Sequence, residues 1–274
     1  MLGAEYLRPF FDGKRPSLFK RTGVTERQDT LAAMLTEGRL GILVEGTPYA
    51  VITPYLFTDH FHTADDYLSG SFYAFFMRAL RIAAVVVAAM LPGVFVAVCV
   101  FHPEIIPADI MFDIAKAESK TPFPLMAEAL IIHLIYEAVR EAGLRMPVAV
   151  GHAVSIVGAL VIGDTAVTAG LIGAPMLIVV ALTAVCSSVA VRLHETVSLL
   201  RFAFILIGGL TGLYGIMLFA GLTLTDLCAG APFGVPYSAP LSPFVRQAQQ
   251  DTIWRADWRK LGRRITTMKE MKFE

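Results

Sequence analysis

The sequence has little charge. Asp, Glu, Lys and Arg make up 17% of the 274 residues, against about a quarter in an average soluble domain. The 23 basic side chains are balanced by 23 acidic ones, so the chain has no bulk electrostatic attraction to nucleic acid. Hydrophobic residues reach 55% and the mean hydropathy is +0.62. This composition predicts an integral membrane protein with several spanning segments.

Cysteine is also scarce, and the motifs of common enzymes are missing. The three cysteines are far apart in the sequence, which favours small core residues over a disulfide framework or a metal site. There is no nucleotide-binding glycine loop and no Ser-His-Asp or Cys-His pattern. His60 and His62 form one close pair near Asp59, but nothing completes a ligand set at metal-binding spacing. We therefore expect no metal, no cofactor and no enzymatic activity.

Residues 1–70 form the polar part of the chain. The first residues lack the apolar core of a signal peptide, so insertion would depend on internal helices. The segment Thr30–Glu37 predicts a short helix with Asp29 or Thr30 as its N-cap. Leu40–Val44 and Tyr49–Thr53 are β-rich and flank a Gly turn, which predicts a hairpin. Because two strands are marginal alone, we interpret this region as a juxtamembrane α/β remnant.

Residues 71–232 are predicted to form the membrane domain. Ile82–Phe101 and Phe202–Thr225 are apolar over about the length that a bilayer requires. Arg78 and Arg81 would stand at the membrane face before the first of these spans. Small residues that recur at four-residue spacing predict close helix packing; they are Ala89, Gly93 and Ala97 in the first span, and Gly208 and Gly212 in the last.

The longest apolar stretch, residues 147–191, contains a single acid, Asp164. It separates a short piece, Ala153–Gly163, from an uncharged run, Thr165–Val191. The short piece predicts a broken or re-entrant segment, which lipid tolerates only where protein or water covers its backbone. We favour Asp164 as the N-cap of the following helix. The alternative is a role in ion passage, in which His152 and Ser155, beside the same break, would share.

The segment 122–141 is apolar but carries ionisable residues. At 100° per residue, His133 and Glu137 share one face of a helix and Glu128 lies opposite. One interpretation is an amphipathic helix on the membrane surface or against the bundle. The other is a spanning helix with a polar face, because ionisable groups inside a membrane segment are costly and indicate function.

The remaining segments set the predicted topology. Residues 191–201, VRLHETVSLLR, are interpreted as a polar connection on the outer side, and residues 233–274 as an interfacial loop followed by a basic tail. The positive-inside rule places that tail, and with it both termini, in the cytoplasm. The tail can also attract anionic lipid headgroups.

These patterns predict an all-α integral membrane helical bundle with about four to five membrane segments, one of them broken, and a small N-terminal α/β remnant. The residues alone favour a channel or transporter subunit. A secondary transporter is the alternative for a broken helix, although no inverted repeat is visible, and a non-conducting scaffold subunit is a third interpretation.

Several motifs carry a resemblance to a known family. In order along the chain they are LVEGTP (43–48), FHPEIIP (101–107), PFP…E (122–128), GHAVSIVGALVIGDTAVTAG (151–170), MLIVVALTA (176–184) and FGVPYSAPLSPF (233–244). Over residues 22–262 the chain resembles the A subunits of GerA-type spore germinant receptors, including stage V sporulation protein AF. The resemblance implies a protein of the spore (forespore) inner membrane that forms ring-like oligomers, releases ions, and acts with a transporter-like B subunit and a lipoprotein C subunit.

The chain departs from this family pattern in two places. The family usually has a large soluble N-terminal domain before the hairpin, whereas about forty residues precede it here. We therefore expect a fragment or a short variant. Glu45 stands where the family usually has Asp, which is a conservative change.

Overall fold

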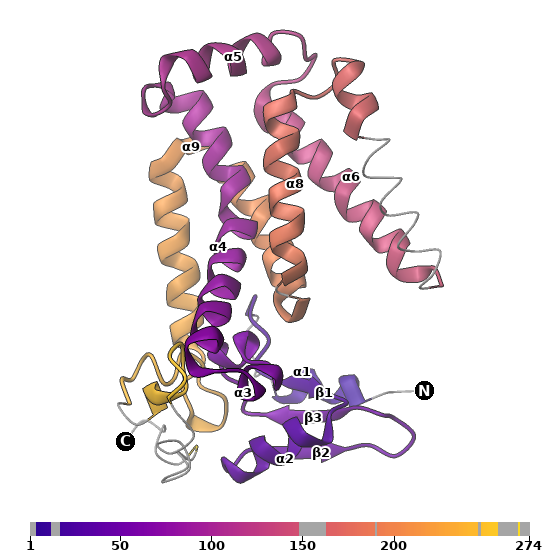
Figure 1. Ribbon diagram of the computed structural model, residues 1–274, viewed down its shortest axis with the longest axis vertical. Coiled ribbons are helices and arrows are strands. Elements are labelled where there is room, and N and C mark those ends of the chain that lie inside the picture. The colour runs from indigo at the N-terminus through magenta and orange to yellow at the C-terminus, as the bar shows by residue number, and fades with distance from the viewer. Residues whose placement is uncertain are drawn as a thin grey trace. The chain divides into compact units, whose positions relative to one another are not determined.

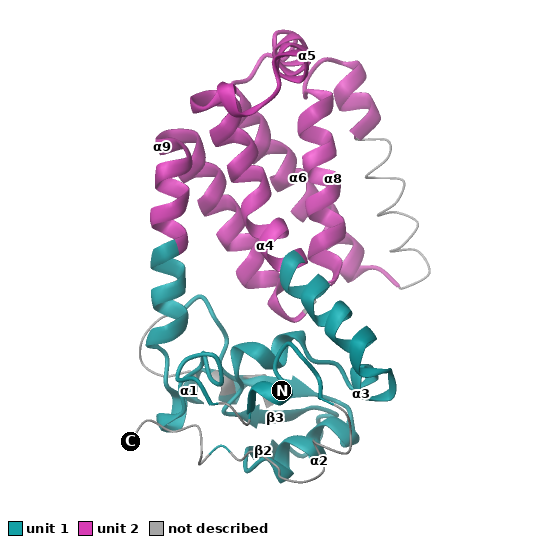
Figure 2. Cartoon of the chain, turned by 60° about the vertical axis from the view of Figure 1, so that its left-hand side comes forward, with its two compact units in different colours: residues 1–83, 221–274 teal, residues 84–220 magenta. Residues whose placement is uncertain are grey.

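The computed structural model describes residues 4–11, 17–147, 163–189, 191–245, 248–256 and 268. The chain divides into two compact units (Figure 2). One contains residues 1–83 and 221–274, and the other contains residues 84–220. Two long helices continue across these boundaries, α4 (Ser71–Phe101) and α9 (His194–Ala229) (Figure 1).

A small antiparallel sheet lies in the first unit. Its strands are β1 (Gly23–Thr25), β2 (Leu40–Leu43) and β3 (Ala50–Thr53), in the order β1-β3-β2. The predicted hairpin is confirmed, with Leu43 opposite Ala50. The central strand β3 is buried along its whole length. Strand β1 was not expected from the sequence, because three residues are too few for a recognisable alternation.

Helix α2 (Gln28–Thr36) packs on the sheet where β2 has a glycine. A side chain at Gly41 would collide with Leu31, so the glycine permits the close approach. The predicted helix is present, but its N-cap is Arg27, and the predicted cap at Asp29 or Thr30 is wrong. The shorter elements of this unit are η1 (Ala4–Leu7), α1 (Arg8–Phe11), η2 (Phe57–Phe61), α3 (Asp65–Leu68), η5 (Pro232–Gly234) and η6 (Ala248–Gln250).

Buried arginines hold the first unit together. Arg78 has no exposed surface, and its guanidinium lies 3.0 Å from Asp251 and 3.5 Å from Asp66. Arg81 also binds Asp66, at 2.7 Å. Their side chains connect the start of α4 to segments from the N-terminal and C-terminal parts of the chain. That both arginines stand at a membrane face stays a prediction.

Among its described residues, the second unit contains helices and turns but no strand. Besides parts of α4 and α9 it contains η3 (Pro103–Ile105), α5 (Ala108–Glu118), α6 (Leu125–Arg145), α8 (Ala174–Val189) and η4 (Val191–Leu193). Its apolar core is formed by Val96, Leu125, Ala129, Ile132, Ala166, Ile172, Met176, Val180 and Ile205. Helix α5 lies in a stretch for which the sequence predicted no helix.

One sequence-based assignment in this unit is wrong. Residues 194–201 form the first two turns of α9, not a polar connection. The uncharged run Thr165–Val191 contains a turn as well as helix. Residues 163–168 are helical, Gly170 adopts a positive φ of 68°, and α8 begins at Ala174. With 16 residues, α8 is shorter than the ~20 that a spanning helix usually needs.

Two of the described helices, α4 and α9, are long and apolar enough to cross a membrane, with mean hydropathies of 2.7 and 2.1 over their most apolar windows. They approach closely at two glycines. A Cβ on Gly93 would lie 2.4 Å from the Phe204 carbonyl oxygen, and one on Gly208 would lie 2.5 Å from the Gly93 carbonyl oxygen. Ala89 and Ala97 are buried on the same helix as Gly93. Gly212 instead interrupts the α9 helix geometry, with a φ of 68°.

Candidate functional site

Arg201 is the centre of a polar network inside the second unit. It lies in the second turn of α9 and has no exposed surface. Its Nε donates to the Ala88 carbonyl oxygen of α4 at 2.8 Å, and its Nη2 donates to Ser187 of α8. Its Nη1 lies 3.5 Å from Glu137 of α6. One guanidinium therefore connects α9 to three other helices, which suits its planar, five-donor geometry.

Glu137 is the anionic partner in this network. Its Oε1 accepts a hydrogen bond from Ser198 at 2.6 Å, and its Oε2 lies 3.3 Å from His194 Nε2. Arg140, one turn along α6, is 3.6 Å away. His194, Ser198 and Arg201 follow each other at i, i+4 and i+7, so they share one face of α9. The start of α9 thus surrounds a half-buried carboxylate with donors.

His133 extends the network along α6. It is fully buried, and its Nδ1 lies 2.8 Å from the Ala129 carbonyl oxygen. Because that oxygen can only accept, Nδ1 must donate. Its Nε2 faces Thr183 of α8 at 3.4 Å, and Ser187 donates to the Thr183 carbonyl oxygen at 2.8 Å. A continuous polar string therefore runs from His133 through Thr183 and Ser187 to Arg201. We call the set His133, Glu137, Thr183, Ser187, His194, Ser198 and Arg201 the polar network.

Among the described residues, one donor of the polar network lacks a hydrogen-bond acceptor. Arg201 Nη1 is buried and has no hydrogen-bond acceptor among the described residues, although it faces Glu137 as an ion pair. A buried guanidinium donor in this state is costly and favours a water or an anion nearby. The arrangement offers charge, donors and acceptors, but no paired nucleophile and base.

Glu128 lies apart from the polar network. It is 1% exposed, and its Oε1 accepts a hydrogen bond from the Gly173 amide at 2.8 Å, just before α8 begins. The helical wheel placed Glu128 opposite His133 and Glu137. It is buried nevertheless, because the turn before α8 covers that side of α6.

The other predicted ion-path residues are not brought together with these. Asp164 lies within the helical residues 163–168 and is exposed, so it does not have the N-cap position that the sequence favoured. His152 and Ser155, and nearly all of the predicted re-entrant segment, lie outside the described residues. Sequence reasoning missed Arg201, His194 and Ser198. Their i, i+4, i+7 spacing was the signal that could have identified them.

The histidine pair of the first unit has separate partners. His60 Nε2 lies 3.0 Å from the Tyr237 hydroxyl, and His62 Nε2 lies 2.7 Å from the Thr252 carbonyl oxygen. Asp59 forms a buried ion pair with Arg39. In the part of the chain that the structure describes, no group of three or more His, Cys, Asp or Glu side chains could hold a metal.

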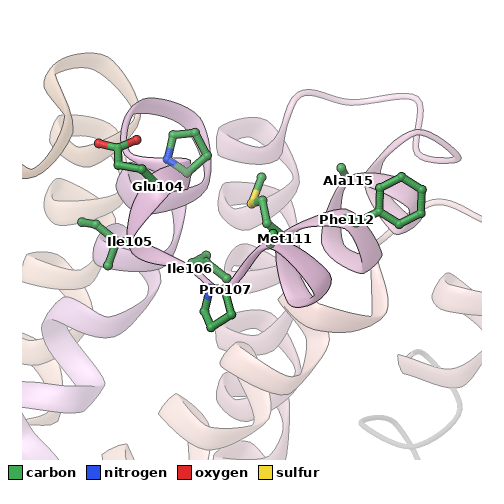
Figure 3. A pocket seen from close by; sticks show the side chains of 9 residues that line it. Glu104, Ile105, Ile106, Pro107, Met111, Phe112 and Ala115 are labelled. Carbon is green, nitrogen blue, oxygen red and sulfur yellow. The ribbon is translucent and has the colours of Figure 1, made fainter.

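A wide depression of about 800 Å³ lies along η3 and α5 (Figure 3). Pro107, Met111, Phe112 and other mostly apolar residues line it, and Glu104 is its one charged lining residue. Its surface offers apolar contact but little that could recognise an ion. The polar network is therefore the better candidate for ion chemistry.

The distribution of side chains defines the class of this protein. Arg201, Glu128 and His133 are buried, whereas Leu210 and Met217 of α9 are 66% and 75% exposed. Charges inside and large apolar side chains outside are typical of helices that face lipid. The second unit therefore has the character of an integral membrane helical bundle.

The comparisons with known proteins identify the family. The model of the Bacillus/Clostridium GerA spore germination protein family matches residues 1–267, and the chain belongs to that family. It is 40% identical over 260 residues to spore germination protein KA of Bacillus subtilis, covering 94% of this chain and 48% of that protein. It is 38% identical over 269 residues to the uncharacterized membrane protein YfkQ of Bacillus subtilis, covering 97% and 52%.

A third relative is spore germination protein GerQA of Bacillus cereus, 36% identical over 257 residues, covering 93% of this chain and 52% of that protein. The chain thus spans about half the length of the curated relatives that it matches. No solved structure matches it. The resemblance seen in the sequence motifs is therefore confirmed at the level of the family.

Proposed function

We propose that this chain is the membrane part of a germinant-receptor A subunit, and that copies of it form an ion channel which triggers germination by ion release. The buried polar network carries this proposal. A scaffold needs no string of charge and hydrogen-bonding groups through an apolar bundle, and such groups are expensive inside a membrane. The family membership supplies the context of germination.

The proposal includes location and partners. The chain would lie in the spore inner membrane with both termini on the core side, as a ring-like homo-oligomer in contact with membrane lipids. A transporter-like B subunit and a lipoprotein C subunit would complete the receptor. No covalent chemistry is assigned to the chain, and nucleic acid is not among the proposed partners.

Reconstitution tests the channel. The purified chain is placed in liposomes, and K⁺ and H⁺ flux is measured under an imposed gradient. We expect flux in the wild type and a changed selectivity in Glu137→Gln, because this substitution removes the charge but keeps the shape. Leu210→Ala, on the exposed face of α9, is the matched control and should conduct as the wild type does.

Two results would replace the channel with another function. Absence of ion flux in every oligomeric state would support a non-conducting scaffold subunit. Uptake of a defined solute coupled to H⁺ or Na⁺ would instead support a secondary transporter, for which the break between residues 163–168 and α8 is the structural argument.

A further inference from the structure

Two carboxyl groups meet in front of the α8 N-terminus, at a place that the polar network does not include. Glu118 ends α5, and Glu128 lies in the first turn of α6. A Cβ built on Gly173 would lie 2.7 Å from Glu118 Oε1 and 3.5 Å from Glu128 Oε1. Both carboxyls therefore crowd one backbone position, and only glycine leaves room for them.

Each carboxyl has one buried oxygen without a hydrogen-bond partner among the described residues. These oxygens are Glu118 Oε1 and Glu128 Oε2. The other oxygen of Glu128 is held by the Gly173 amide at 2.8 Å. A backbone amide at the start of a helix stabilises a negatively charged carboxylate. Glu128 is therefore the member of the pair that stays charged more readily.

In the part of the chain that the structure describes, no cation compensates the pair. Among the described residues, neither carboxyl forms an ion pair with Lys, Arg or His, and the other groups that face them are neutral. The Cys99 thiol of α4 lies near Glu118, and the Thr121 hydroxyl faces Glu128. Two adjacent carboxylates with buried oxygens and no cation repel each other, which favours protonation of one of them. Burial, together with the charge and hydrogen bonding of Glu128, raises the pKa of Glu118 to about 7.

We propose that Glu118 and Glu128 bind one shared proton, and that this proton holds α5 against the junction of α6 and α8. The protonated Glu118 donates to the free oxygen of Glu128, which satisfies both buried oxygens at once. This proton-binding site does not depend on ion conduction by the chain.

Helix α5 is well suited to be released by such a site. Ile114 is its one fully buried side chain, whereas Ile110 and Phe112 are 54% and 71% exposed. A helix with few buried contacts opens at low free energy. Deprotonation of the pair removes one hydrogen bond and adds one charge repulsion at the C-terminus of α5. This change can therefore shift the equilibrium between docked and open α5.

The direction of the pH effect follows from the raised pKa. The protonated form of Glu118 is bound more tightly in the docked state than in the open state. The contribution of this proton to docking is complete below the ordinary pKa of a glutamate, about 4.3, and is lost as the pH rises through about 7. Between these two values the open fraction of α5 should grow by up to about tenfold per pH unit, and above about 7 it should level off.

Two measurements on the full chain in lipid nanodiscs test the proposal. Infrared difference spectroscopy follows carboxyl protonation between pH 5 and pH 9. Amide hydrogen exchange of α5, divided by the intrinsic chemical rate at each pH, reports its opening. We expect a carboxyl that titrates near neutral pH, and an α5 opening that rises up to that pH and then levels off.

Variants connect both signals to the pair. Glu118→Gln should remove the neutral titration and make α5 opening independent of pH. Glu128→Gln should move the titration of Glu118 to lower pH, because the neighbouring charge is gone. Asp113→Asn, an exposed change on the same helix, should behave as the wild type does.

Three outcomes would overturn the proposal. One is a wild type without a carboxyl titrating near neutral pH, and another is an α5 opening that does not follow that titration. The third is displacement of the protonated carboxyl signal at pH 6 by added Na⁺ or Ca²⁺, which would make the pair a cation site.

Discussion

At the scale of single residues, the most informative side chain is Arg201. The sequence placed it in an exterior connection because HETVSLLR contains charges and follows a long apolar run. The structure places it at the centre of four helices, because its neighbours His194 and Ser198 repeat at helical spacing and find Glu137 on α6. The charged composition of this segment favoured a loop, whereas the helical spacing of His194, Ser198 and Arg201 favoured a helix. The helical spacing agrees with the structure.

Arg201→Met should destabilise the bundle strongly. Removing one member of a buried ion pair costs about 3–5 kcal/mol, because the partner charge stays behind. Unfolding of the purified chain by denaturant in mixed micelles measures the loss. Adding Glu137→Gln to Arg201→Met should recover part of it. Arg140→Gln is the control at the same carboxylate, and its more exposed pair should contribute at most about 1 kcal/mol.

Asp59 is expected to make the first unit sensitive to acid. Burial alone would raise the pKa of Asp59, but the charge and hydrogen bonds of Arg39 lower it below the ordinary value. The resulting stability is present above the unfolded pKa of about 3.9 and is lost as the pH falls through the folded value. Amide exchange in β3, followed from pH 6 downward, should show this loss.

Asp59→Asn should remove that acid-dependent part and weaken the unit at neutral pH. Glu37 remains 2.9 Å from Arg39, so we expect a loss near the lower end of the range for a broken buried pair, about 3 kcal/mol. Asp65→Asn, at an exposed carboxylate in the same unit, is the control. An equal effect in both variants would contradict the role of the buried pair.

At the scale of elements, the sequence predicted correctly those structures whose formation depends on residues close together in the chain. The hairpin follows from β-branched residues on both sides of Gly46, which adopts a φ of 82°. Strand β1 and helix α5 were missed because their pairing and burial depend on partners distant in sequence.

The crossing of α4 and α9 depends on the absence of a side chain. Gly208→Ala would place a Cβ 2.5 Å from the Gly93 carbonyl oxygen, and overpacking of this kind costs about 1–3 kcal/mol. Gly221→Ala is a matched control on the same helix, because nothing lies within 4 Å of its added Cβ. It should be neutral or stabilising by up to about 1 kcal/mol through helix propensity. Thermal unfolding of both variants in one detergent compares them, and equal destabilisation would rule out a tight crossing.

At the scale of the whole molecule, composition correctly indicated helices in an apolar environment, but it could not decide how many of them span. Two described helices have the required length. The candidate site could be predicted only in part: His133 and Glu137 stood out as ionisable residues in an apolar run, whereas their partners on α8 and α9 could not be assigned without the packing. Which charges face each other is a property of the tertiary structure.

The spanning role of α9 can be tested through its exposed face. Leu210 lies near the middle of this 36-residue helix and is 66% exposed. If that face contacts lipid, Leu210→Arg places a charge near the bilayer centre, at a cost of about 2.5–3.5 kcal/mol on insertion scales. Leu43→Arg, at a 75% exposed position on the edge strand β2, adds the same charge outside the helices. The membrane-embedded fraction is measured after alkaline extraction. We expect it to fall for Leu210→Arg and to stay unchanged for Leu43→Arg. Equal retention of both variants would show that α9 does not present this face to lipid.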